Sequence, residues 1–377
     1  MALSPLAIKT HFRKLKDPRR KRRNLHLLID IIAITLCGVI CGANDWQEIE
    51  IFAKSRRDWL KTFLRLPNGI PSHDTLERVF DRLNPIVFQA CFREWMQALA
   101  ETLGLAQIAI DGKTLRGSGV GGRGALHLIS AWATANSLSL GQLAVDEKSN
   151  EIPAIPKLLE MLNVHGALVT IDAMGCQKEI AAKIVELGGD YVLPVKDNQP
   201  ALLADIQECF AKAAEDDFAN VQHDTYQTEE RGHGREEKRH YQIIIDPEFA
   251  SKPEWKNLRV IGLFSSECVR EGKLQSETRF FIGSRKAKAK VYGQALRNHW
   301  SIENRLHWQL DVTFAEDQNR VSKRQAADNL AVIRRVALSL LKQHPEKRSI
   351  ACKRLKAALD PNFLEEVLHG DARSGKV

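Results

Sequence analysis

The sequence has few cysteines and no cysteine motif. Its 377 residues include seven cysteines, and no two of them form a C-x-x-C pair. This absence excludes a cysteine-bound structural zinc and a disulfide-stapled secreted scaffold, and it favours a reducing compartment. The basic N-terminus is not followed by a small-residue cleavage site, so no secretory signal is predicted.

Long apolar runs are also missing. Residues 27–43 are the most apolar stretch, but Asp30 interrupts them. The stretch is short for a helix that must cross a bilayer with about 20 apolar residues. We therefore predict a buried core helix there and no membrane partner. The glycine-rich stretch GSGVGGRG is not a P-loop, because the order of glycine and lysine is wrong for that motif.

The composition is that of an ordinary soluble protein with unevenly placed charge. Hydrophobic residues make up 44%, charged residues 27%, and the formal net charge is +8. The length suffices for two domains and a sizeable core. Lysines and arginines crowd residues 9–23, with Asp17 alone against them. We predict that residues 1–24 form a flexible basic arm suited to a phosphate backbone, the alternative being a solvated tail.

Residues 25–104 have a helical pattern. The expected helices cover residues 27–41, 46–63, 72–83 and 85–103. A Gly/Pro break precedes the third of them, as a helix-turn-helix requires. On that interpretation Leu76, Val79 and Phe80 pack inward. Arg78 then faces DNA, whereas a plain helical bundle explains the same spacing.

From residue 106 the pattern becomes that of an α/β protein with a mixed sheet. Strands are expected at residues 108–111, 127–133, 140–145, 168–172, 191–195, 241–245, 259–264 and 277–282. Helices are expected at residues 155–162, 177–187, 205–215 and 326–343, and from about residue 287. Residues 222–239 are polar and charged, and residues 344–377 form a short basic tail.

Two of these strands end in a carboxylate. The run IAI leads into Asp111, and ALVTI leads into Asp172. Burying a carboxylate costs several kcal/mol unless a cation or hydrogen bonds offset the lost hydration. One strand-end aspartate alone commonly caps a turn. Two buried strands that each deliver an acid at one end indicate a shared site for a hard divalent cation.

A third acid, Glu303, lies in the aromatic-rich segment NHWSIENRLHWQLDVTFAED. The order Asp in IDGK, Asp in IDAMG and Glu in HWSIENRLHW resembles the DDE transposases of bacterial insertion sequences. The resemblance is closest to the H-repeat-associated type found beside Rhs elements. It extends to residues 27–95, to VKDNQ at residues 195–199 and to GHGREEKR at residues 232–239, so it covers nearly the whole chain.

The resemblance implies an RNase H-like catalytic domain at residues 105–343, whose first and fourth strands lie side by side. It also implies a mainly β insertion at about residues 200–284 and an all-α, transposase-associated domain at residues 25–104. The implied activity is cleavage and strand transfer of an insertion-sequence-like element. The implied partners are double-stranded DNA, both element ends and target, and a second copy in a homodimer, located in the bacterial cytoplasm at the nucleoid.

The three acids suit this chemistry. Two Mg²⁺ ions, or Mn²⁺ in their place, can activate the nucleophile and stabilise the leaving oxygen of a phosphodiester. We assign Asp111 to both ions, Asp172 to one and Glu303 to the other. Ala109 and Thr170 share a strand face with the two aspartates, and their small size leaves room for metal and phosphate.

DNA contacts are expected beside the acids and in the insertion, in addition to Arg78. The candidates are Lys113, Arg116, Lys196, Asn198, Gln199, His233, Arg235 and Arg239. A solvent-facing position without a ligand explains Lys113 and Arg116 equally well. The chain departs from the family pattern Tyr-x2-Arg-x3-Glu-x6-Lys, because Leu296, His299 and Leu310 replace its Tyr, Arg and Lys.

Two other interpretations stay open. His299, Glu303 and His307 are spaced by four residues and would share a helical face, which could bind Zn²⁺ or another transition metal as in a hydrolase of another class. That interpretation leaves the two strand-end acids unexplained. The other is a catalytically silent DNA-binding remnant of a mobile element.

Overall fold

The chain divides into two compact units in this computed structural model. The first unit comprises Met1–Gly104, Gly112–Asn150 and Glu303–Val377, and the second comprises Leu105–Asp111 and Glu151–Ile302. The structure describes residues 8, 10–12, 14–19, 24–116, 125–145, 151–232, 235–270, 273–319, 321 and 323–369. The glycine-rich stretch, His233 and most cations of the basic arm lie outside these described residues.

The first unit is mainly helical. It contains α2 (Leu28–Ile40), α3 (Trp46–Ser55), α4 (Arg57–Lys61), α5 (His73–Arg82), α6 (Pro85–Leu103), α11 (Arg324–Gln343), α12 (Ile350–Leu359) and α13 (Pro361–His369). The all-α N-terminal region is confirmed. One expected helix, at residues 46–63, is divided at Arg56, which ends α3 and precedes α4.

Helix α2 belongs to the core of the first unit, as predicted. The carboxylate of Asp30, whose residue is only 2% exposed, accepts a hydrogen bond from the Leu66 backbone N–H at 2.9 Å. A buried acid is therefore satisfied by a backbone donor from the loop before α5. None of the helices that the structure describes is long and apolar enough to span a bilayer.

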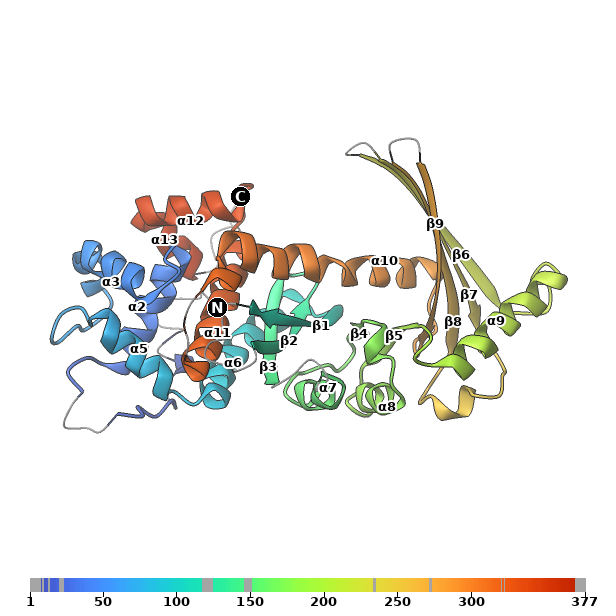
Figure 1. The fold of residues 1–377 in the computed structure, drawn as a ribbon, viewed down its shortest axis with the longest axis horizontal. Coiled ribbons are helices and arrows are strands. Elements are labelled where there is room, and N and C mark those ends of the chain that lie inside the picture. Colours follow the sequence, from blue (N-terminus) through green and yellow to red (C-terminus); the bar gives the residue numbers. More distant parts are fainter. Residues whose placement is uncertain are drawn as a thin grey trace. The chain divides into compact units, whose positions relative to one another are not determined.

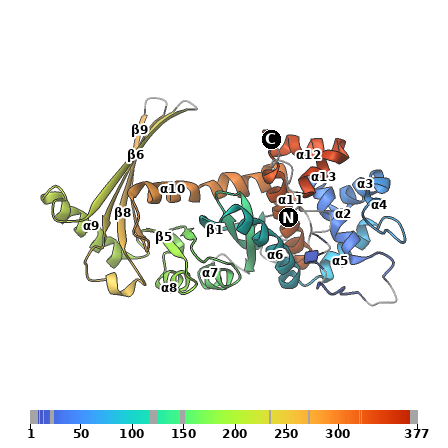
Figure 2. The same cartoon turned by 180° about the vertical axis from the view of Figure 1, so that it is seen from behind.

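Helix α11 joins the N-terminal helices to the rest of the first unit (Figure 2). It packs against α2, α5 and α6, and the Asn329 side chain donates to the carbonyls of Phe80 and Leu83 at 2.8 and 3.0 Å. The segment expected as a basic tail instead forms α12 and α13. Arg354 on α12 is buried and donates to the Val39 carbonyl at 3.0 Å, so this segment packs on α2.

The sheet has nine strands in the order β3-β2-β1-β4-β5-β9-β8-β7-β6. Its first five strands in sequence are β1 (Gln107–Leu115), β2 (Leu126–Ala133), β3 (Leu138–Val145), β4 (Leu168–Ile171) and β5 (Asp190–Val195). Strand β1 pairs with β4 in parallel, and β4 pairs with β5 in parallel. The first and fourth strands therefore lie side by side, which is the order expected of an RNase H-like domain.

The second unit carries the mainly β insertion, which is confirmed. Helix α9 (Pro200–Glu215) precedes four long antiparallel strands, β6 (His223–Gly232), β7 (Arg235–Ile245), β8 (Val260–Arg270) and β9 (Lys273–Gly283). Figure 1 shows these strands extending well past α10 (Ala289–His299). The α10 side of the second unit buries Ile243, Phe281 and Tyr292 in one core cluster.

Residues 222–239 show no strand pattern in the sequence, yet residues 223–232 form β6 and residues 235–239 begin β7. Here opposite charges face each other across the ladder: Glu229 is the register partner of Lys238, and their side chains lie 3.4 Å apart. Cross-strand pairs of this kind support a sheet without apolar alternation. Alternating hydrophobicity therefore could not reveal these strands.

Helices cover the two faces of β4 and β5 in the second unit. In both views α7 (Glu151–Glu160) and α8 (Lys178–Glu186) lie on one side of these strands and α10 on the other (Figures 1 and 2). Leu168 and Val192 on the strands pack with Ala295 on α10. This packing holds β4, whose last residue, Ile171, directly precedes Asp172.

Candidate metal centre

Asp111 and Asp172 occupy equivalent places on two neighbouring strands. Ile110 on β1 is the register partner of Ile171 on β4, and each aspartate is the next residue of its chain. Adjacent strands are about 4.8 Å apart. Asp172 directly follows the last residue of β4, whereas Asp111 lies within β1, which continues to Leu115 and so is longer than the strand predicted at residues 108–111. The two acids thus follow register partners on adjacent parallel strands within the second unit.

A hydrogen bond and a close backbone approach restrict the conformation of the turn that follows Asp172. The Asp172 Oδ1 accepts a hydrogen bond from the Gly175 N–H at 3.1 Å, so the aspartate caps a short 3₁₀ helix, Ala173–Gly175. A Cβ at Gly175 would lie 2.2 Å from Cγ2 of Ile171, which requires glycine there. Both interpretations of this acid hold at once: it ends a buried strand and it caps a turn.

Two residues that were predicted to contact DNA hold this turn. The Asn198 side-chain amide donates to the Ala173 carbonyl, and that of Gln199 donates to the Cys176 carbonyl, each at 2.9 Å. Both amides therefore join the loop after β5 to the loop after β4. Lys196, the third candidate in this motif, is exposed.

The network around Thr170 ties the end of α10 to β4. Gln107 donates to the Thr170 hydroxyl at 3.2 Å and to the Ala295 carbonyl at 2.8 Å. His299 Nδ1 also lies 3.2 Å from that hydroxyl. Thr170 thus acts as a polar anchor, a role that its small size alone did not predict.

Glu303 lies in a π-helix rather than in the α-helix that the sequence suggests. The segments Glu303–His307 and Gln309–Thr313 are both π-helical. Such winding is rare and frequent at functional sites. His307 Nδ1 lies 3.6 Å from Glu303 Oε2; the histidine side chain is 4% exposed and that of the glutamate 55%. The pair therefore presents a carboxylate to solvent above a buried imidazole.

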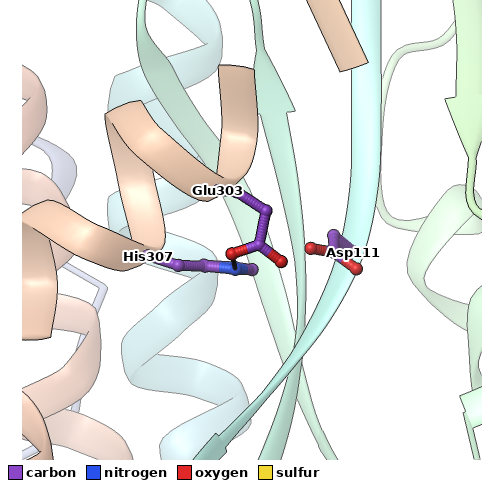
Figure 3. Close-up of side chains that lie close together, drawn as sticks. All are labelled: Asp111, Glu303 and His307. Carbon is purple, nitrogen blue, oxygen red and sulfur yellow. Dashed lines mark ion pairs between the residues drawn. The ribbon is translucent and has the colours of Figure 1, made fainter. Parts of the chain in front are cut away.

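Asp111, Glu303 and His307 form a group that could hold a metal ion. One ligand atom from each lies within 4.8 Å of the others, and Figure 3 shows the three side chains converging. Within the described part of the chain, this group includes neither Asp172 nor His299. Two carboxylates and an imidazole suit a divalent cation such as Mg²⁺, Mn²⁺ or Zn²⁺, so the donors fit. The sequence suggested His307 only as a ligand for zinc or another transition metal, together with His299 and Glu303.

Lys113 is buried in a cluster of charges in the first unit. Its side chain is 8% exposed, and its Nζ contacts Asp311 and, at 2.9 Å, Glu316 Oε2. The other oxygen of Glu316 accepts from Arg335 at 2.8 Å. Burial alone would raise the pKa of Glu316, but the charges of Arg335, Lys113 and Arg334 outweigh it and lower the pKa to about 2. Glu316 is therefore an ionised, buried anchor.

The remaining candidate DNA contacts differ in exposure. Arg116 has a side chain that is 84% exposed, whereas that of Arg239 is 12% exposed and pairs with Glu237 at 2.6 Å. The side chain of Arg235 is not among those described. On α5, Arg78 is exposed and its Nε donates to the Asp74 carbonyl at 3.0 Å. The apolar positions of α5 are buried as predicted: Leu76, Val79 and Phe80.

Comparison with known proteins identifies the family. The family described as "Transposase DDE domain" matches residues 103–340, and the one described as "DDE_Tnp_1-associated" matches residues 9–96. The chain is 41% identical over 377 residues to the "H repeat-associated putative transposase YhhI" of Escherichia coli (strain K12), covering 97% of this chain and 98% of that protein. It is 41% identical over 362 residues to the "Putative transposase YncI" of Escherichia coli O157:H7, covering 94% and 92%.

One solved structure is also similar, the "piggyBac transposase synaptic complex with hairpin DNA", at 10% identity and a TM-score of 0.44, covering 99% of this chain and 83% of that chain. The family match covers residues 103–340, and the relatives cover nearly the whole chain. The chain therefore belongs to the DDE transposase family, together with the H-repeat-associated transposases of Escherichia coli.

Proposed function

We propose that this protein is a DNA transposase that cleaves phosphodiester bonds at the ends of an insertion-sequence-like element and joins them to target DNA. The observation that carries the proposal is the placement of Asp111 and Asp172 directly after the register partners Ile110 and Ile171. Two carboxylates on adjacent strands match the donors that a phosphoryl-transfer metal site needs.

Asp111, Asp172 and Glu303 are the residues that would hold divalent metal, with His307 as a further ligand or as a partner that orients Glu303. Bound Mg²⁺ would lower the pKa of an attacking water or hydroxyl and neutralise charge on the phosphate. The protein's own contribution is positional. The capped turn after Asp172 and the buried imidazole beneath Glu303 limit how far either carboxylate can move.

The partners follow from this activity. Double-stranded DNA would be bound as element end and as target, and exposed cations such as Arg116, Lys196 and Arg78 are candidates for its phosphates and bases. Joining two ends calls for two active sites, so we propose a homodimer on DNA. In a bacterial cell this places the protein on the nucleoid.

A cleavage assay tests the proposal. Duplex DNA carrying the element's flanking repeats is incubated with wild-type protein and with Asp111→Asn, with and without Mg²⁺. Asp197→Asn is the matched control, because Asp197 is an exposed acid in the loop after β5. Wild type and Asp197→Asn should cut only with metal, and Asp111→Asn should not cut. Binding of DNA without cutting by wild type would instead identify a silent DNA-binding remnant.

A further inference from the structure

Strand β1 continues past Asp111, and the side chains beyond it meet the segment that follows Glu303. Lys113 lies two residues after Asp111, and its ammonium group contacts Asp311 and Glu316. The backbone N–H of Arg116 donates to Asp317 Oδ1 at 3.2 Å. All three acids of residues 311–317 are therefore bound by the IDGKTLRGS stretch, although about 200 residues separate them in sequence.

Glu316 connects this contact to the core of the first unit. Its side chain is fully buried, and it bridges Lys113 on one oxygen and Arg335 of α11 on the other, at 2.9 and 2.8 Å. A buried carboxylate held between two cations has one well-defined geometry, because every lost contact leaves a buried charge without a partner. The segment after the π-helices is thereby fixed to both β1 and α11.

Lys113 is poorly suited to contact DNA. Its side chain is 8% exposed, and two carboxylates already surround its ammonium group. A DNA phosphate would have to displace these acids and enter the buried cluster. By contrast, Arg116, directly after β1, leaves its side chain 84% exposed, as a phosphate contact requires.

We propose that Lys113 is a positioning residue, which acts through Glu316 and Asp311 to hold the π-helical segment that carries Glu303 and His307. This inference rests on the proposed function, in which Glu303 binds metal. It assigns Asp311, Glu316 and Asp317 to anchoring and leaves Glu303 as the metal-binding acid of its segment. Two consecutive π-helical stretches are an uncommon structure, and a buried anchor immediately after them explains how they are maintained.

The experiment compares Lys113→Met with Arg116→Met and Lys113→Arg in the full-length chain. Hydrogen exchange without metal or DNA should show amides of Glu303–Thr313 exchanging about tenfold faster in Lys113→Met, with no change in Arg116→Met. Lys113→Arg keeps the charge and should retain most of the protection. In Mg²⁺, cleavage by Lys113→Met should fall about tenfold and require more metal for half-maximal rate.

The salt dependence of duplex binding distinguishes an anchoring role of Lys113 from a phosphate contact. The slope of the logarithm of the binding constant against the logarithm of the salt concentration should stay unchanged in Lys113→Met, whereas loss of a phosphate contact reduces its magnitude by about 0.9. Unchanged exchange with a reduced slope overturns the inference. If wild type does not cleave, the proposed function fails, and the exchange result still decides whether Lys113 anchors the segment. If Lys113→Met does not fold, Asp311→Asn removes the more exposed partner and should raise exchange in the same amides; no rise would contradict the anchor.

Discussion

Ile110 and Ile171 are register partners on parallel strands, and an aspartate follows each of them. This relationship brings two acids onto neighbouring strands, although they are 61 positions apart in sequence. In the second unit, α8 and α10 pack on the two faces of the sheet.

Glu303→Gln should reduce Mg²⁺-dependent cleavage by at least about a hundredfold, because an amide cannot replace a charged ligand at a hard cation. Asp311→Asn, in the same segment, should retain far more activity since Asp311 pairs with Lys113. Initial rates on one flanking-repeat duplex give the comparison. If Asp311→Asn is the more damaging substitution, Asp311 rather than Glu303 is the third ligand.

His307→Gln should change the metal preference of the site. An imidazole favours Mn²⁺ and Zn²⁺ over Mg²⁺, so its loss should weaken Mn²⁺ binding about tenfold and Mg²⁺ binding less. Titration of each ion by calorimetry makes the measurement. His299→Gln is the control, because His299 lies against Thr170. An equal loss of Mn²⁺ affinity in the control would support the alternative ligand set of His299, Glu303 and His307.

Gly175→Ala should destabilise the protein by about 1–3 kcal/mol, because the added methyl group would meet the Ile171 side chain in a packed site. Gln199→Ala should cost about 1 kcal/mol by removing a hydrogen bond to the turn after Asp172. Urea unfolding at neutral pH measures both. Gly166→Ala tests backbone strain alone, since its φ is 73° and nothing lies within 4 Å of its Cβ position. If Gly166→Ala lowers the free energy of unfolding more than Gly175→Ala does, the predicted clash at Gly175 is wrong.

The pKa of Glu316, lowered from 4.5 to about 2, predicts a pH dependence of stability. The ionised carboxylate stabilises the fold above pH about 4.5, and this contribution is lost as the pH falls toward about 2, on the order of 3 kcal/mol in all. Glu316→Gln should therefore be much less stable than wild type at pH 7, with a difference that narrows in acid. Glu179→Gln, at an exposed acid on α8, is the control. If the difference in free energy of unfolding between wild type and Glu316→Gln stays constant from pH 7 to pH 3, the pKa of Glu316 does not change on folding.

The sequence predicted most of what depends on local pattern. Short apolar runs bounded by turns identified β1 and β4, and their acids lie where those runs end. The buried stripe of α5 followed from helical spacing in the same way. Strand β6 was missed because its stabilising pairs lie across the ladder, and no single strand shows them.

Contacts between distant segments could not be predicted. Lys113 was considered as a phosphate contact because it lies just after Asp111 in sequence. Nothing in its neighbouring residues indicates that its partners are Asp311 and Glu316. Asn198 and Gln199 were also predicted to contact DNA, and the sequence did not show that their amides bind backbone carbonyls near Asp172. Nor does sequence spacing distinguish an α-helix from the π-helix at Glu303.

We propose that Asp111, Asp172 and Glu303 bind metal together. Iron-mediated backbone cleavage tests it directly: Fe²⁺ is bound to the full-length protein, ascorbate and peroxide are added, and the cut positions are mapped by mass spectrometry. Cuts are expected near all three residues, each suppressed by excess Mg²⁺ and absent in Asp111→Asn. Cuts confined to the neighbourhood of Glu303 and His307, with none near Asp172, would contradict it.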